Sequence, residues 1–311
     1  MHIVAIIIGC LLLIAVVILT VGCFYFYNLA ISRKSKDFLT GHADLVEMPV
    51  EEESWLQQQD IEKVSLQSYD DLKLRGHWLP AAQLSSITII IAHGYSGHGM
   101  LMDSLARMYH EHFGYNVLMP DNRGHGESEG NYIGFGWHDR KDYLKWIDYV
   151  IDRKGANEQI GLHGVSMGGA AVLMTSGEQL PAAVKAIVSD CAYTTVEDQL
   201  RYQLKRMFKL PSFPFVMLTS VLCRYRAGYS FAEASALKQV AKATKPILFI
   251  HGDQDAFVPT EMVNRLYEQC NSEKELHIVP GAGHGLAYLT DPGGYIKAVR
   301  SFFQKHFSLA D

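Results

Sequence analysis

Three polar side chains in the second half of the chain have the types and the order needed for nucleophilic catalysis. Ser166 stands at the centre of the run Gly-Val-Ser-Met-Gly-Gly, an aspartate follows near position 255, and His284 lies in the run Gly-Ala-Gly-His-Gly. A serine hydroxyl attacks a carbonyl carbon efficiently when a neutral imidazole takes its proton, and a carboxylate must hold the other nitrogen of that imidazole. These residues therefore predict acyl transfer through an acyl-enzyme on Ser166.

The acid and the oxyanion donors have more than one candidate. Asp253 and Asp255 both follow the apolar run 247–250, so either carboxylate can be the one that orients the histidine. The negative charge that develops on the attacked carbonyl needs two hydrogen-bond donors aimed at it. The backbone N–H of Met167, directly after the serine, and that of Tyr95, after a His-Gly turn, are the candidates.

The serine must be presented on a sharp turn between a strand and a helix. Residues 159–163 predict a buried strand, and the apolar run 170–174 predicts the start of a helix. Glycines on both sides of Ser166 keep the turn free of side chains that would collide with the strand and the helix. The same pentapeptide also describes an ordinary glycine-rich turn, so its partners in other loops decide the interpretation.

Strands and helices alternate along the rest of the chain. The expected strands are 64–68, 72–79, 87–92, 116–119, 159–163, 186–189, 247–250 and 276–279, of which the first two form an antiparallel pair. The expected helices include 101–112, 140–152, 261–269 and 295–307, the last opened by Asp291 as N-cap and Pro292 at the first helical position. This alternation predicts an α/β fold with a mostly parallel, doubly wound sheet. The active residues are then expected at the carboxyl ends of the strands.

The chain resembles the α/β-hydrolase superfamily of serine hydrolases from about residue 64 to its end. The motifs that carry the resemblance are His93-Gly94, Asp121-x-Arg-Gly-His-Gly-x-Ser128, Gly164-x-Ser-x-Gly-Gly169, Gly252-x-x-Asp255-x-x-Val258-Pro259 and Gly283-His284. Within the superfamily it is similar to the small-cap, membrane-anchored branch, which includes serine-aminopeptidase-like and depalmitoylase-like hydrolases. The resemblance implies a Ser166–Asp255–His284 triad, with Asp255 preferred to Asp253, and neither a metal nor an organic cofactor. It also implies that Arg123 and His125 support their loop.

The N-terminus carries an apolar run long enough to cross a membrane. Residues 3–27 include no charge, and at roughly 1.5 Å per residue they give a helix of about 37 Å. The run is longer than the apolar centre of a cleaved signal peptide, which favours an uncleaved anchor. Gly22-Cys23 allows the alternative of a bacterial lipoprotein site. We therefore expect an anchor over 1–30, a juxtamembrane segment over 31–60 and a hydrolase domain over 61–311.

The charges beside the anchor indicate its orientation. Arg33, Lys34 and Lys36 follow the apolar run, whereas its other side carries none. By the positive-inside rule the catalytic domain is then cytoplasmic and the protein is a single-pass protein of the cell membrane. An exported, anchored hydrolase is the alternative.

A helical insertion is expected to form a small cap over the site. It spans about 191–245, between two expected strands, and Arg201, Lys205 and Lys209 form a basic stripe on its helix 196–208. The segment 213–222 is strongly apolar. The cap either has an ordinary solvated basic face over a packed apolar one, or it leans on anionic lipid headgroups next to the anchor.

Composition excludes several classes of protein and site. The net charge of −5 and the absence of a basic tract argue against nucleic acid as a partner. Outside the anchor, Cys191, Cys223 and Cys270 form an odd, widely spaced set, which argues against a disulfide framework and a zinc site. The spacing in His110-Glu111-His112 does not place both imidazoles on one helix face. The oligomeric state is left open.

Together these features predict hydrolysis of a carboxylic ester or thioester of a small-molecule or lipid acyl substrate. Peptide hydrolysis and acyl transfer use the same three residues and stay open as alternatives, because residues of the cap set the choice of substrate. A membrane-anchored binding protein that keeps the fold without catalysis is the alternative from another class.

Overall fold

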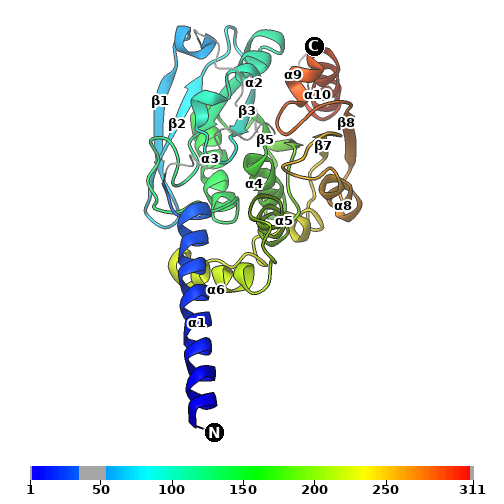
Figure 1. The fold of residues 1–311 in the computed structure, drawn as a ribbon. Helices are drawn as coiled ribbons and strands as arrows, with labels where there is room; N and C mark the ends of the chain where they lie inside the picture. The colour runs from blue at the N-terminus through cyan, green and yellow to red at the C-terminus, as the bar shows by residue number, and fades with distance from the viewer. Residues whose placement is uncertain (1, 35–53, 309–311) are drawn as a thin grey trace.

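An eight-stranded sheet forms the centre of the protein, whose computed structural model describes residues 2–34 and 54–308 (Figure 1). The strand order is β1-β2-β4-β3-β5-β6-β7-β8. Pairing is antiparallel between β1 and β2 and between β2 and β4, and parallel elsewhere. The strands are β1 Glu62–Gln67, β2 Lys73–Leu79, β3 Ile87–Ala92, β4 Asn116–Pro120, β5 Gln159–Val165, β6 Val184–Asp190, β7 Ile247–Gly252 and β8 Lys274–Val279.

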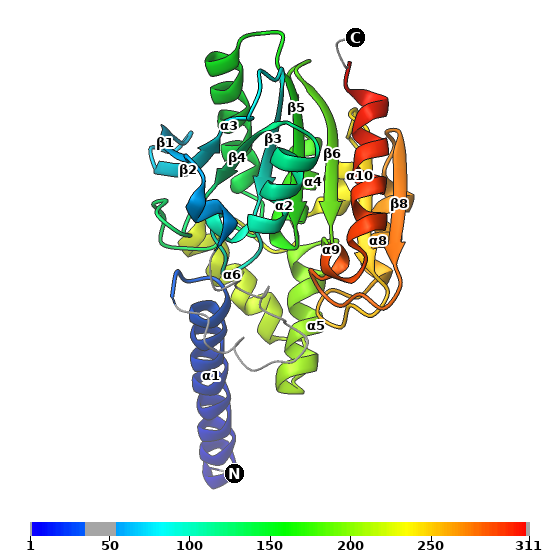
Figure 2. The same ribbon diagram turned by 90° about the horizontal axis from the view of Figure 1, so that it is seen from above.

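Helices cover both faces of this sheet, as Figure 2 shows. One apolar layer lies under α3 Asp139–Lys154, α4 Met167–Ser176, α7 Ala236–Val240 and α8 Glu261–Gln269. The other lies under α2 Asp103–Arg107, η4 Met108–His112, α9 Ala287–Thr290 and α10 Pro292–His306. Central strands such as β3 are buried along their whole length, as expected for parallel strands covered on both sides. The predicted α/β-hydrolase fold, with its mostly parallel sheet, is confirmed.

The expected helix 101–112 is broken into three pieces, which is the clearest departure from the predicted elements. A 3-10 turn, η3 Gly99–Leu101, precedes the short α2, and a π-helical turn, η4, follows it. Asp103 stands at the start of α2, but its carboxylate accepts the backbone N–H of Leu56 and the hydroxyl of Ser54. These bonds hold the short helix η2 Trp55–Gln58, in which Leu56 is buried, against the domain.

The helix α1 His2–Ala30 projects from the domain on the side to which the carboxyl ends of the parallel strands point (Figures 1 and 2). Its apolar side chains are exposed over most of its length, and by length and composition it is able to span a membrane. This agrees with the predicted N-terminal anchor. Where α1 ends, Ile31 is completely buried in the domain.

The residues after α1 are bound directly to the domain. The N–H of Ile133 donates to the carbonyl of Ile31 over 2.7 Å, and that of Arg33 donates to Asn131 over 3.0 Å. The Arg33 guanidinium also donates to the carbonyls of Ser128 at 2.7 Å and Gly126 at 2.8 Å. Arg33 is therefore a structural link as well as a charge beside the membrane span.

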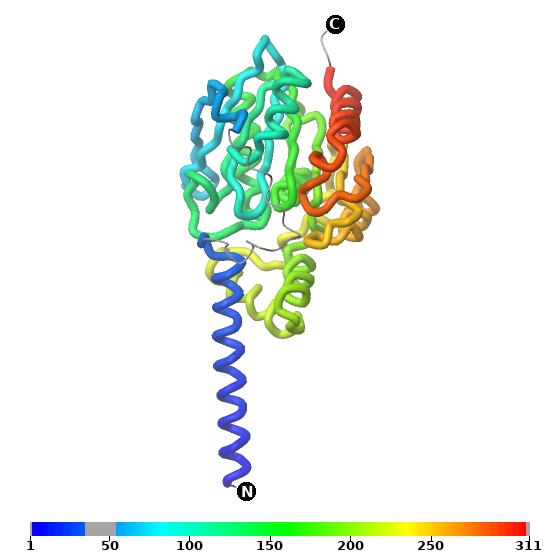
Figure 3. Tube along the Cα trace, turned by 45° about the horizontal axis from the view of Figure 1, so that its top comes forward, coloured from blue at the N-terminus to red at the C-terminus, as the bar shows by residue number. Residues whose placement is uncertain are grey.

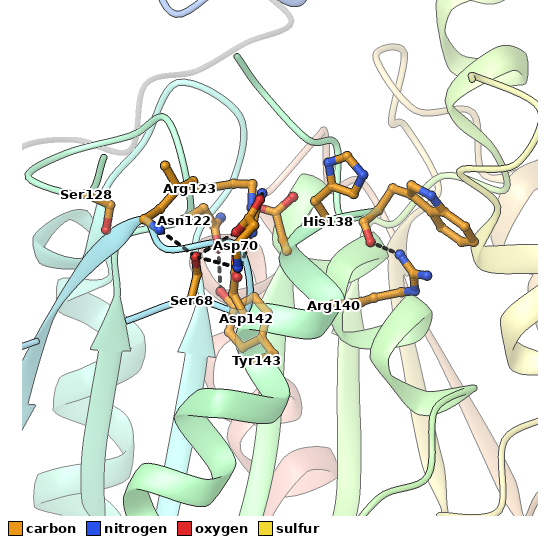
Figure 4. A network of polar contacts seen from close by, with 12 residues as sticks. Ser68, Asp70, Asn122, Arg123, Ser128, His138, Arg140, Asp142 and Tyr143 are labelled. Atoms are coloured by element: carbon orange, nitrogen blue, oxygen red, sulfur yellow. Dashed lines mark hydrogen bonds and ion pairs between the residues drawn. The ribbon is translucent and has the colours of Figure 1, made fainter. Parts of the chain in front are cut away.

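The loop that receives Arg33 is itself held by a buried arginine (Figure 4). Arg123 donates two hydrogen bonds of 2.7 Å to Asp142 of α3 and two of 2.9 and 3.0 Å to Asp70, in the turn between β1 and β2. Paired bonds of this kind between a guanidinium and carboxylates fix geometry as well as charge. The contacts agree with a supporting role for Arg123 in its loop.

The insertion between β6 and β7 contains three helices, which lie in two different places. The helices α5 Val196–Phe208 and α6 Phe215–Ala227 lie beyond the sheet on the side of α1, and α6 crosses α1 (Figure 3). The third, α7, packs against α4 and belongs to the layer that covers the sheet. The cap therefore consists of α5 and α6, whereas α7 is part of the layer that covers the sheet.

Candidate active site

Ser166 occupies a strained turn between β5 and α4. Its φ and ψ are +57° and −116°, a backbone conformation that side-chain-bearing residues rarely adopt. Its N–H donates to the carbonyl of Asp190 at the end of β6 over 2.8 Å. The turn thus projects the serine beyond the carboxyl ends of the central strands, as the sequence predicts.

Gly168 shows how tightly this turn is packed, and its replacement by alanine is expected to destabilise the protein. An added Cβ would lie 2.0 Å from the carbonyl oxygen of Ala92, a backbone atom that cannot rotate away. Forced overpacking of this kind costs about 3 kcal/mol. The control is Gly293→Ala, where the nearest atom to the new Cβ is 3.9 Å away. Thermal unfolding of both purified variants tests the difference, and equal midpoints would contradict it.

His284 and Asp255 stand in line with the serine. The Nε2 atom of His284 lies 2.7 Å from Ser166 Oγ, and its Nδ1 atom lies 2.7 Å from Asp255 Oδ2. All three residues are buried, although His284 and Ser166 keep a small exposed fraction of 9% each through which a substrate can reach them. The structure thus brings together the three residues that the sequence singles out.

The surroundings of Asp255 favour its ionised form. Burial raises its pKa, but the electrostatic interaction with the His284 imidazole and hydrogen bonds from His251 and His284 outweigh burial, so the pKa of Asp255 lies well below its usual value. The backbone N–H groups of Phe257 and Val258 also donate to its Oδ1 at 2.9 and 2.8 Å. This carboxylate is therefore fixed in both charge and orientation.

The alternative acid, Asp253, points elsewhere. Its Oδ1 accepts the N–H of Gly281 over 2.7 Å, which holds the loop after β8. The hydrogen bond from His284 is instead made with Asp255. The geometry therefore favours the aspartate that the family resemblance selects.

The two proposed oxyanion donors flank the serine. Met167 is the first residue of α4, so its N–H belongs to the positive end of that helix. Gly94, which precedes Tyr95, lies so close that an added Cβ would be 3.5 Å from Ser166 Cβ. The side chain of Tyr95 makes a contact that the sequence did not indicate: its hydroxyl donates to the carbonyl of Ala30 at the end of α1 over 2.8 Å.

A cavity of about 100 Å³ leads from Ser166 toward the cap and the anchor. Among the described residues that line it, none carries a charge. The cap contributes mainly apolar side chains, and the last turns of α1 contribute Phe26, Leu29 and Ala30. Sequence reasoning missed this wall. The sequence indicates only a membrane anchor for the apolar run to which these residues belong.

The residues considered for a metal site have other partners. In the run His110-Glu111-His112, the Glu111 carboxylate already accepts hydrogen bonds from Trp55 and Arg107. In the described chain, the one group of three side chains close enough to share an ion is Cys191, Asp255 and His284. In that group the two histidine nitrogens are already engaged by Ser166 and Asp255.

The fold and the nucleophile turn define an α/β-hydrolase. The sequence model of the prolyl oligopeptidase family matches residues 102–310, so the chain belongs to this family. It is 32% identical over 216 residues to the protein YqkD of Bacillus subtilis (strain 168), covering 69% of this chain and 70% of that one. It is also 24% identical to the Saccharomyces cerevisiae membrane protein YNL320W, covering 78% of each.

Solved structures share the fold. An esterase of Pyrococcus furiosus, Pf2001, superimposes with a TM-score of 0.65 over 81% of this chain and 93% of its own, at 24% identity. An acylaminoacyl peptidase of Pyrococcus horikoshii gives a TM-score of 0.61 over 82% of this chain and 43% of its own, at 17% identity. Enzymes named as esterases and enzymes named as peptidases therefore share this architecture.

Proposed function

We propose that the protein is a membrane-anchored serine hydrolase that cleaves a carboxylic ester or thioester through an acyl-enzyme on Ser166. The observation that carries the proposal is the hydrogen-bonded line from Ser166 Oγ through His284 to Asp255 at one end of an uncharged cavity. A hydroxyl, a base and an orienting carboxylate at these distances are what nucleophilic acyl transfer requires.

In the proposed mechanism, Ser166 Oγ attacks the carbonyl carbon while His284 Nε2 takes its proton. Asp255 stabilises the resulting imidazolium, and the backbone N–H groups of Tyr95 and Met167 bind the oxyanion. His284 then gives the proton to the leaving oxygen or sulfur, the bond to the leaving group breaks, and the acyl group stays on Ser166. Water attacks this ester with the same base, and the acid is released.

The lining of the cavity favours an acyl substrate over a peptide with a free amino terminus. An α-ammonium group removed from water needs a carboxylate or comparable partners nearby. The described lining residues include no carboxylate. Apolar side chains such as Leu204 and Met207 suit an acyl chain instead.

Peptide hydrolysis is the second candidate, because the family that matches the chain is named for oligopeptidases. A panel of acyl esters, thioesters and aminoacyl amides separates the two, since the proposed function expects turnover of the first two classes. Fluorophosphonate labelling of the purified protein separates either enzyme from a binding protein that lacks catalysis. Preferential cleavage of the amides would move the assignment to the peptidase.

The catalytic domain is proposed to lie in the cytoplasm, with Met1 on the other side of the membrane. The basis is the contrast between the uncharged start of the chain and Arg33, Lys34 and Lys36 after the span. Reporters fused after Asp311, one active only inside the cell and one only outside, are expected to give signal from the inside reporter alone. Activity of the outside reporter alone would place the domain on the cell surface.

A further inference from the structure

The size of the cavity limits how much of an acyl chain it holds. A cavity of about 150 Å³ accepts a six-carbon ring, so the cavity of about 100 Å³ beside Ser166 holds about four carbons. The rest of a longer chain must leave the cavity and find apolar surroundings elsewhere. Each methylene exposed to water lowers binding by a factor of about four.

The wall formed by α1 offers such surroundings because α1 is also the candidate membrane span. Phe26, Leu29 and Ala30 line the cavity, and the exposed apolar part of the same helix begins a few residues earlier. At roughly 1.5 Å per residue, Ala30 stands only about 12 Å along the helix axis from Gly22. The same helix therefore contacts the cavity at its C-terminal end and the hydrocarbon core of the membrane in its preceding turns.

The cap helix α6 crosses α1 at this level. An added Cβ on Gly22 would lie 2.8 Å from the ring of Phe215, and the rings of Phe26 and Phe215 are 5.7 Å apart. Arg226 lies over the rings of Phe24 and Tyr27. Aromatic residues at the end of a span sit at the depth of the lipid headgroups, so α6 lies at that depth as well.

The outer side of the α6 segment carries an apolar stripe. Phe213, Met217, Val221 and Tyr225 follow one another at intervals of four residues, with exposed fractions of 70%, 49%, 63% and 90%. Spacing by four places Met217, Val221 and Tyr225 on one face of α6, and Phe213 lies just before the start of this helix. Apolar residues exposed at headgroup depth next to a span suit contact with lipid, and the basic Arg224 and Arg226 flank them.

From these contacts we infer that the end of α1 and the cap form an acyl-chain subsite that opens to the bilayer, so that the substrate is a long-chain acyl ester or thioester resident in the membrane. The inference rests on the proposed hydrolase function and adds the source and length of the acyl group. The first carbons lie in the cavity, and the remaining chain stays in the lipid beside α1 and α6. Leu29 is then a residue that determines chain-length specificity.

The test compares a short and a long ester of one leaving group. Full-length protein is reconstituted in vesicles of phosphatidylcholine and phosphatidylglycerol and given 4-nitrophenyl acetate, whose two acyl carbons leave the outer part of the cavity empty, or 4-nitrophenyl palmitate. Leu29→Trp fills the wall of the cavity and is expected to slow the palmitate reaction by about tenfold, the effect of roughly two methylene groups losing apolar contact. Turnover of the acetate, which does not need the outer part of the cavity, is expected to change by less than about twofold.

Val21→Trp is the matched control, because it enlarges an exposed side chain of α1 that does not line the cavity. Neither ester is expected to respond to it. Fluorophosphonate labelling of each variant checks that the site is intact, and if Leu29→Trp loses labelling, Met207→Trp on the cap side of the cavity replaces it.

Equal effects of the wall variant on both esters, or an unchanged palmitate rate, would overturn the inference while leaving the hydrolase function in place. Failure of the unaltered protein to hydrolyse either ester would instead count against the proposed function.

Discussion

Replacing Ser166 with alanine is expected to lower kcat for ester hydrolysis by about 10⁶ and to abolish labelling by fluorophosphonates. The size of the loss follows from the way the three residues act together, because His284 has no proton to accept once the hydroxyl is gone. Its Nε2 atom lies 2.7 Å from Ser166 Oγ, and no side chain at position 166 then forms the acyl-enzyme. The measurement is kcat for a 4-nitrophenyl ester with the purified protein in detergent.

Thermal unfolding of Ser166→Ala serves as the control, since loss of one hydroxyl at the turn should leave the fold intact. The backbone strain at this position is unchanged, because alanine also carries a Cβ. Substantial turnover by the folded variant would refute the acyl-enzyme mechanism and require another nucleophile.

The second large effect is expected from Asp255→Asn, which should reduce the rate by about 10⁴. The amide cannot neutralise the imidazolium formed when His284 takes the serine proton, and its NH₂ group favours the wrong tautomer of the ring. The low pKa of Asp255 means that the carboxylate is charged across the neutral range, so its loss removes a charge that the enzyme normally has. Steady-state rates of the variant and the parent give the comparison.

Asp253→Asn is the matched control two residues away. Its carboxylate accepts the N–H of Gly281, a bond that the amide oxygen of asparagine can also accept, so the variant should change the rate little. If Asp253→Asn were the more damaging of the two, the acid would have to be reassigned.

Much of the fold was predictable because local sequence and tertiary packing agree. The apolar run Ile87–Ala92 ends at His93-Gly94, and β3 has the same bounds as predicted. The helix Pro292–His306 begins as its Asp291-Pro292 start predicts, with Asp291 accepting the N–H of Gly294. The turn at Ser166 was recognisable from its glycines. They are needed because the backbone of neighbouring segments comes too close to leave room for side chains.

Other features depend on contacts between distant parts of the chain, which no local pattern encodes. The helix predicted over 101–112 breaks, and Asp103 beside the break is bound by Ser54 and Leu56, about 50 residues earlier. The hydrogen bond from Tyr95 to Ala30 joins the nucleophile region to the end of the anchor across 65 residues. The cavity beside Ser166 was missed for the same reason, since one of its walls belongs to α1.

The backbone and guanidinium bonds of Arg33 leave little freedom between the end of α1 and the catalytic domain. A hydrolase on a long flexible tether samples a volume of solution, whereas in the proposed membrane-anchored arrangement α1 would hold this domain at a constant height and tilt above the lipid. Encounters with the membrane-resident substrate that we infer would then be two-dimensional, and turnover should follow the surface density of the substrate rather than its bulk concentration. A fixed height would also favour acyl bonds that lie at one depth in the headgroup region.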